Sequence, residues 1–236
     1  MRGLFVTGTD TGVGKTTVTA ALAWGLRERG LEVGVMKPVE TGVPAGAAWP
    51  PDAALLAEAA GAADPRDLVV PAHYPDPLAP WIAARRSGQP VPWDHLLEAA
   101  AALAARHPRL LVEGAGGLAV PLDATRTMAD LAGALGLPLL VVARAGLGTI
   151  NHTLLTLDYA RARGLAVAGV VFNGFRGSDP AEADNPAAVA ELTGVPVLGR
   201  LPQLPPGAGR LYARLSAHLD WEALAGPPGP LGERPG

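Results

Sequence analysis

Near its start, the chain has the residue types that bind phosphate. The stretch GTDTGVGKTT (8–17) follows an apolar run and precedes a helical pattern. Backbone amides and the positive dipole end at the start of such a helix attract anions. We expect Lys15 to reach the β- and γ-phosphates of a nucleotide, and the Thr16 hydroxyl to bind Mg²⁺. The strict spacing G-x-x-x-x-G-K-[ST] fails by one residue between Gly8 and Gly14, and a glycine-rich turn without a ligand is the alternative.

A second lysine stands in a comparable position. Lys15 and Lys37 are the two lysines of the chain, and all other basic residues among its 19 lysines and arginines are arginine. This bias suggests that both positions need a compact ammonium rather than a guanidinium. Lys37 follows an apolar run and is expected at the carboxyl edge of a sheet, where Thr41 and Gly42 could add a hydroxyl and a close backbone approach. A solvated surface charge is the alternative.

Two acidic residues could hold a metal ion beside these lysines. Glu113 ends the apolar run of RLLVEGAGG (109–117), and burying a lone carboxylate is costly unless it is paired. The glycines at 114, 116 and 117 let the backbone approach a ligand closely. Asp52 follows Pro51 and makes a good helix N-cap, and capping alone would also explain it.

Two further segments carry polar groups at the expected ends of strands. In ARAGLGTINHTLL, Thr149 could cap a helix whose free amides near 148–151 would suit an anion. A simple capped turn explains this segment equally well. In VVFNGF, the amide of Asn173 could read the edge of a base, although Asn-Gly is also a common turn pair. The five histidines show no metal-binding spacing.

The elements that must position these residues alternate along the chain. Strands are predicted at 3–8, 31–37, 109–117, 137–146, 165–174 and 195–202, and helices at 15–29, 52–61, 93–107 and 150–164. Strands that are apolar on both faces predict an α/β fold with a doubly wound, mostly parallel sheet of about seven strands. Right-handed crossovers place the site at the carboxyl edge. The proline-rich segments 43–51 and 71–92 are predicted as long loops over that edge.

Composition limits the classes of function. A chain of 236 residues with 49% hydrophobic content suits one domain, predicted over 1–225, with a disordered Pro/Gly-rich tail at 226–236. The net charge of −3 gives no basic face for nucleic acid or for anionic lipid. The lack of cysteine excludes disulfides, cysteine-bound metals and a thiol nucleophile. Without a signal peptide or a membrane-spanning run, a cytoplasmic protein is expected.

Six stretches, taken in order, resemble the dethiobiotin synthetases. They are GTDTGVGKT, KPVETG, VEGAGGLAVPL, GTINHTLLT, VVFNGF and VLGRLP, and the resemblance spans roughly residues 3–220. The family has the same five-residue gap between the glycines. The resemblance implies a single-domain P-loop NTPase fold and an ATP- and Mg²⁺-dependent ligase. That ligase joins CO₂ to 7,8-diaminopelargonic acid through a carbamate and a carbamic–phosphoric anhydride, and gives dethiobiotin, ADP and phosphate.

The resemblance also implies roles for individual residues. Lys15 and Lys37 would be catalytic, and the magnesium set would be Thr16, Asp52 and Glu113. The implied nucleotide site comprises Gly12, Val13, Gly14, Lys15, Thr16, Thr17, Asp52, Glu113, Gly114, Ala115, Gly116, Asn173, Gly174, Pro202, Gln203 and Leu204. The implied substrate site comprises Thr11, Lys37, Thr41, Gly148, Thr149, Ile150 and Asn151. In the family's homodimer, the segment that matches 148–151 receives the substrate carboxylate from the neighbouring subunit, so each active site lies near the interface.

This sequence departs from the family at a few positions. Gly12 stands where several members have an acidic residue, Trp81 replaces a frequent histidine, and the segment 177–186 matches poorly. The main alternative is a partitioning-type regulatory ATPase of the same superfamily, but such proteins usually carry an extra lysine within positions 9–11, which read Thr-Asp-Thr here. A cobyrinate-type amidotransferase would need a cysteine-dependent glutaminase. A small-molecule phosphotransferase would release a phosphorylated product.

Overall fold

The computed structural model describes residues 2–177, 179–204 and 211–225, so the predicted tail at 226–236 lies outside the described residues. Its central sheet has six parallel strands in the order β2-β5-β1-β6-β7-β8. The strands are β1 (Gly3–Gly8), β2 (Gly34–Met36), β5 (Leu110–Gly117), β6 (Leu139–Arg144), β7 (Val167–Phe175) and β8 (Val197–Pro202). A separate parallel pair consists of β3 (Val39–Thr41) and β4 (Ala72–Tyr74).

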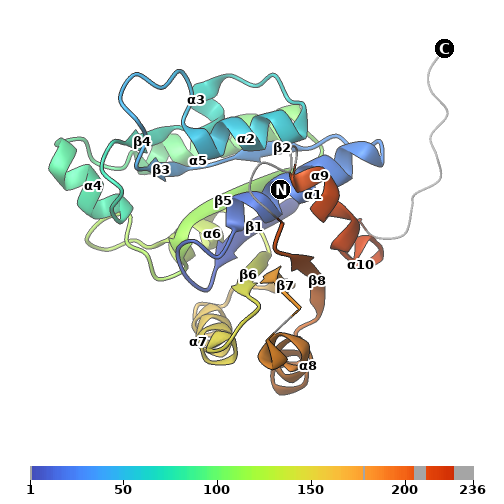
Figure 1. Cartoon of the computed structure of the whole chain (residues 1–236). Coiled ribbons are helices and arrows are strands. Elements are labelled where there is room, and N and C mark those ends of the chain that lie inside the picture. Colours follow the sequence, from blue (N-terminus) through green and yellow to red (C-terminus); the bar gives the residue numbers. More distant parts are fainter. Residues whose placement is uncertain (1, 178, 205–210, 226–236) are drawn as a thin grey trace, which may run out of the picture.

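Helices lie on both sides of the central sheet (Figure 1). They are α1 (Lys15–Glu28), α2 (Pro51–Ala60), α3 (Arg66–Val69), α4 (Pro80–Ser87), α5 (Trp93–Arg106), α6 (Met128–Leu135), α7 (Thr149–Ala162), α8 (Pro180–Thr193), α9 (Leu211–Leu215) and α10 (Trp221–Ala225), with a 3₁₀ turn at η1 (Ser216–His218). Within the described residues, no helix is both long enough and apolar enough to cross a membrane.

The core confirms the predicted doubly wound arrangement. Successive residues of a strand face opposite sides of the sheet, and in β1 the neighbours Phe5 and Val6 are both fully buried. Val6 belongs to the cluster that contains Leu22 of α1 and Leu56 of α2. Phe5 belongs to the cluster on the other face, which contains Leu103 of α5. A strand that is buried on both faces reads as a continuous apolar run.

Some predicted boundaries were wrong. The central sheet has six strands, close to the predicted number of about seven, and the unpredicted strands β3 and β4 pair with each other outside it. The segment 71–92 is not a long loop: it contains β4 and α4. Its prolines misled the prediction, since Pro80 occupies the first position of α4, where a missing N–H costs nothing. Most of the poorly matching segment 177–186 lies inside α8, which begins at Pro180.

The register of the strands determines which side chains meet at the carboxyl edge. In the parallel pair of β2 and β5, Met36 lies opposite Val112. The next residues along these strands are Lys37 and Glu113. In the pair of β1 and β5, Val6 lies opposite Glu113 and Gly8 opposite Gly117. The glycine-rich turn after β1 therefore begins next to the strand that carries Glu113.

Candidate active site

The turn between β1 and α1 has the strand–turn–helix geometry predicted for a phosphate-binding loop. Gly14 is the N-cap of α1 and has a φ of 95°, which side-chain-bearing residues rarely adopt. A Cβ on Gly14 would lie 2.0 Å from Nδ2 of Asn173. Glycine is thus required here both for the left-handed backbone and for the close approach of a neighbouring side chain.

Asn173 holds this turn from the end of β7. Its Nδ2 donates a hydrogen bond of 2.9 Å to the carbonyl oxygen of Val13. The predicted base-reading amide is therefore brought beside the phosphate loop, and its N–H group is already bonded to the backbone. This contact joins the two regions of the predicted nucleotide site.

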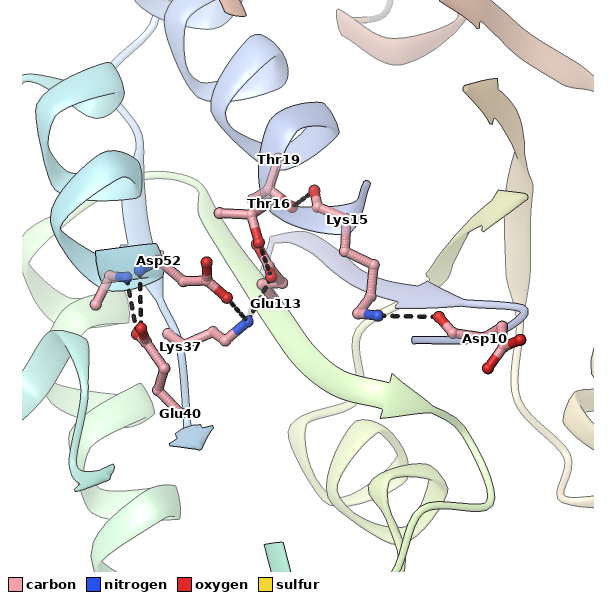
Figure 2. A network of polar contacts seen from close by, with 9 residues as sticks. Asp10, Lys15, Thr16, Thr19, Lys37, Glu40, Asp52 and Glu113 are labelled. Atoms are coloured by element: carbon pink, nitrogen blue, oxygen red, sulfur yellow. Dashed lines mark hydrogen bonds and ion pairs between the residues drawn. The ribbon is translucent and has the colours of Figure 1, made fainter. Parts of the chain in front are cut away.

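Lys37 lies between the two carboxylates predicted to hold a metal (Figure 2). Its Nζ is 2.8 Å from Oδ2 of Asp52 and 2.5 Å from Oε1 of Glu113. The hydroxyl of Thr16, in the first turn of α1, donates to the same Glu113 oxygen at 2.8 Å. The predicted metal set, Thr16, Asp52 and Glu113, is therefore gathered around the ammonium of Lys37.

Burial and charge act on the two lysines in different ways. Burial alone would lower the pKa of Lys37, but the charges and hydrogen bonds of Glu113 and Asp52 outweigh it and raise that pKa above its ordinary value. Burial, followed by the positive charge of Lys37, lowers the pKa of Lys15, although Glu113 and Asp52 oppose this shift. A lowered pKa means that the protein around Lys15 stabilises its positive charge less well than water does.

Both lysines line one cavity of about 470 Å³. The predicted residues that line it are Thr11, Gly12, Gly14, Lys15, Thr16, Thr17, Lys37, Thr41, Asp52, Glu113, Ala115 and Gly116. Val39, Glu40 and Leu55 line it as well, and sequence reasoning did not single them out. The cavity thus brings together the phosphate loop, the end of β2, the start of α2 and the end of β5.

The side chain of Lys15 turns away from Lys37 within this cavity (Figure 2). Its Nζ donates to the carbonyl oxygen of Asp10 at 3.2 Å. The Asp10 carboxylate in turn accepts the N–H of Thr11 at 2.7 Å and pairs with Arg144, at the end of β6, at 2.8 Å. Sequence reasoning missed Asp10 and Arg144, because 134 residues separate them.

The donor atoms around Lys37 suit a hard divalent cation. Within the described part of the chain, no group of three or more His, Asp or Glu side chains is placed to hold a metal. Two carboxylates and a hydroxyl remain, and Mg²⁺ is usually bound in this way, by one or two carboxylates together with substrate phosphates and water. The second oxygen of Glu113, Oε2, is buried and has no hydrogen-bond partner. The donor set therefore fits Mg²⁺.

Asp52 is not the helix cap that the sequence suggested. Pro50 is the N-cap of α2, Pro51 is the first helical residue, and Asp52 is the second. Because Asp52 caps nothing, its carboxylate is free to pair with Lys37. The backbone N–H groups at this end of α2 are bonded instead to the carboxylate of Glu40, in β3.

Several predicted residues do not line this cavity. Gln203, just after β8, accepts a hydrogen bond of 2.6 Å from Nε of Arg176. The segment 148–151 forms the start of α7, where Gly148 is the N-cap and Thr149 is the first helical residue, so Thr149 is not the predicted cap. The predicted residues that do not line the cavity are Val13, Gly114, Asn173, Gly174, Pro202, Gln203, Leu204 and 148–151.

Known proteins identify the family. A family model described as an AAA domain matches residues 2–208. The ATP-dependent dethiobiotin synthetase of Anaeromyxobacter dehalogenans (strain 2CP-C) is 52% identical over 90% of this chain and 95% of its own length. That of Aquifex aeolicus (strain VF5) is 47% identical over 81% of this chain and 85% of its own length. The chain belongs to the dethiobiotin synthetase family.

Solved structures confirm the P-loop NTPase fold of this family member. A ParA family ATPase from Chlorobium tepidum TLS matches with a TM-score of 0.58 at 14% identity, over 95% of this chain and 99% of that one. A MinC:MinD cell division complex from Aquifex aeolicus matches with a TM-score of 0.57 at 14% identity, over all of both chains. At such low identity the likeness shows the fold alone, so it does not favour the partitioning-type alternative.

Proposed function

We propose that this chain makes dethiobiotin from 7,8-diaminopelargonic acid, CO₂ and ATP and releases ADP and phosphate. The identity to named dethiobiotin synthetases supports this activity. The observation that carries the proposal is the single cavity in which Lys15 and Lys37 meet Thr16, Asp52 and Glu113. Two cations and a set of oxygen ligands at the start of a P-loop helix suit the transfer of a phosphoryl group.

The chemistry proceeds through three steps. One amine of the substrate adds to CO₂ and loses a proton, which gives a carbamate. A carbamate oxygen then attacks the γ-phosphorus of ATP, and the bond to ADP breaks. The second amine attacks the carbonyl carbon of this mixed anhydride and loses a proton, phosphate leaves, and the ureido ring closes. The first and third steps need positioning, and the second needs neutralisation of phosphoryl charge.

The residues of the cavity divide this work. The backbone amides of 12–17 and the ammonium of Lys15 would hold the phosphates. Lys37 would neutralise the negative charge on the carbamate oxygens and on the γ-phosphoryl oxygens. Thr11 and Thr41, which line the same cavity, would contact the diamine. Thr16, Asp52 and Glu113 would hold Mg²⁺, which when bound lowers the charge on the phosphate oxygens. In support of this assignment, the ammonium of Lys37 forms ion pairs with Asp52 and Glu113, two members of the proposed metal set.

We propose that two further surfaces, which lie outside the cavity, bind the purine and face the neighbouring subunit. We assign the base to Asn173, Gly174 and 202–204, and the bond from Asn173 to the phosphate loop supports this assignment. A homodimer would bring 148–151 of one subunit to the substrate carboxylate of the other. In support, this segment does not line the cavity of its own chain, and Leu147 beside it is 86% exposed. The cytoplasmic location stays a prediction.

A product assay tests the proposed function. Purified protein is incubated with ATP, Mg²⁺, bicarbonate and 7,8-diaminopelargonic acid, and dethiobiotin and ADP are quantified by mass spectrometry. We expect one ADP for each dethiobiotin, with no turnover above background when the diamine is left out. ATP hydrolysis that proceeds at the same rate with or without the diamine would contradict the proposal and would favour the regulatory ATPase.

A further inference from the structure

The start of helix α2 lacks the usual means of satisfying its backbone N–H groups. The first four N–H groups of a helix have no partner inside the helix. Here the N-cap is Pro50, which makes no side-chain capping bond, and the first helical residue is Pro51, which has no N–H. Asp52 and Ala53 are therefore the first residues with N–H groups to satisfy, and Ala53 is fully buried.

The carboxylate of Glu40 satisfies both of these groups from another element. Its Oε1 accepts the N–H of Asp52 at 2.8 Å, and its Oε2 accepts the N–H of Ala53 at 3.0 Å (Figure 2). The Glu40 residue is only 5% exposed. A negative charge at this position also interacts favourably with the positive end of the α2 dipole.

This contact fixes the position of one of the proposed metal ligands. Glu40 holds the backbone of Asp52, whose side chain lies in the proposed magnesium set. Only two residues lie between Lys37 and Glu40, and Lys37 contacts the same Asp52 through its carboxylate. The short segment 37–40 therefore contacts the first turn of α2 in two ways. Glu40 binds its backbone N–H groups, and Lys37 binds the side chain of Asp52.

From this geometry we infer that Glu40 is a positioning residue for the metal site, acting through the first turn of α2. Both of its oxygens are bonded to backbone N–H groups, so its role is to place Asp52 rather than to bind the metal. Without this cap, the first turn of α2 would shift or fray, and Asp52 would lose its fixed distance to Glu113 and Thr16. The inference rests on the proposed function, in that it takes Asp52 as a metal ligand.

Two substitutions of Glu40 separate capping from charge. Glu40→Gln keeps the size of the side chain but places an NH₂ group against one of the two N–H groups. Glu40→Asp keeps the charge but shortens the side chain by one methylene group, so that it cannot reach both amides. A matched control is Glu182, which is also 5% exposed and accepts the N–H groups of Arg176 and Gly177 at 2.8 and 2.9 Å. The control variant is Glu182→Gln.

The readout is the affinity for Mn²⁺, measured by electron paramagnetic resonance with a saturating non-hydrolysable ATP analogue and without diamine. Loss of a residue that orients a metal ligand typically weakens binding by about 10- to 100-fold. We expect a loss of this size in both Glu40 variants and unchanged affinity in Glu182→Gln. Thermal unfolding measured in parallel identifies the folded fraction of each variant, and the affinity is referred to that fraction.

Three results would overturn the inference. The first is a wild-type Mn²⁺ affinity in folded Glu40→Gln. The second is a wild-type affinity in Glu40→Asp while Glu40→Gln loses affinity, which would assign the effect to charge. The third is an equal loss of affinity in Glu182→Gln. Because no diamine is present, these results are independent of which product the enzyme makes. Failure of the proposed function would show instead as the absence of dethiobiotin from the wild-type enzyme.

Discussion

Replacement of Lys37 by methionine should destabilise the protein strongly when nucleotide and divalent metal are absent. Methionine keeps an unbranched side chain of similar reach but has no charge. The substitution leaves Glu113, which is 0% exposed, without the cation 2.5 Å from its Oε1. Removal of one partner of a buried ion pair typically costs about 3–5 kcal/mol.

The exposure of the second carboxylate limits this cost. The side chain of Asp52 is 42% exposed, so water screens its charge, and most of the loss comes from Glu113. We therefore expect a decrease in the free energy of unfolding of about 3 kcal/mol, at the lower end of that range. For a chain of this size the decrease corresponds to a fall in Tm of roughly 6–12 °C.

The assay is urea and thermal unfolding in EDTA, followed by circular dichroism. The control is the double variant Lys37→Met/Glu113→Gln, which removes the buried charge along with its partner and should recover much of the loss. Added Mg²⁺ should restore part of the stability of Lys37→Met, because a cation that binds only the folded state stabilises it. Two results would show that the buried ion pair does not hold this site together. One is a decrease in the free energy of unfolding of Lys37→Met of less than about 1 kcal/mol, and the other is a double variant that is less stable than Lys37→Met.

Two further predictions concern Lys37 and Asp123. Lys37→Arg keeps the charge, but a guanidinium is larger and planar, so it cannot place a compact charge at the position of the ammonium. We expect a fall in kcat for dethiobiotin formation of about 100-fold or more, and a near-wild-type rate would remove Lys37 from the mechanism. At Asp123, partial burial is outweighed by hydrogen bonds from Thr125 and Arg126, and the pKa falls from 3.8 to about 2. A carboxylate with a lowered pKa stabilises the folded state above its unfolded pKa, and this contribution disappears as the pH falls through the folded pKa. The stability difference between wild type and Asp123→Asn should therefore be constant above pH 5 and shrink between about pH 4 and 2, and urea unfolding that shows a constant difference throughout would contradict it.

The sequence was sufficient to predict which groups gather at the carboxyl edge. Glycine spacing, two rare lysines and a carboxylate at the end of an apolar strand are local features, and a parallel sheet places strand ends together. Lys15, Lys37 and Glu113 were found in this way. The strand order then explains the pairing of Lys37 with Glu113, because β2 and β5 are neighbours.

Contacts between distant segments could not be predicted in the same way. Which residue satisfies the N–H groups of α2 depends on how β3 packs against that helix, and the local pattern offered only Asp52 itself as a candidate cap. Composition misled the prediction in 71–92, where proline starts a helix instead of breaking one. The pair of Asp10 and Arg144 depends on the adjacency of β1 and β6, for which no short motif exists.

The structure of the complex with a non-hydrolysable ATP analogue, Mg²⁺ and 7,8-diaminopelargonic acid tests most directly whether both lysines serve one phosphoryl group. We expect Nζ of Lys15 and Nζ of Lys37 within about 3 Å of γ-phosphate oxygens, with the diamine in the same cavity. A nucleotide whose γ-phosphate contacts only one of the two lysines, or a diamine bound outside this cavity, would contradict the proposed function.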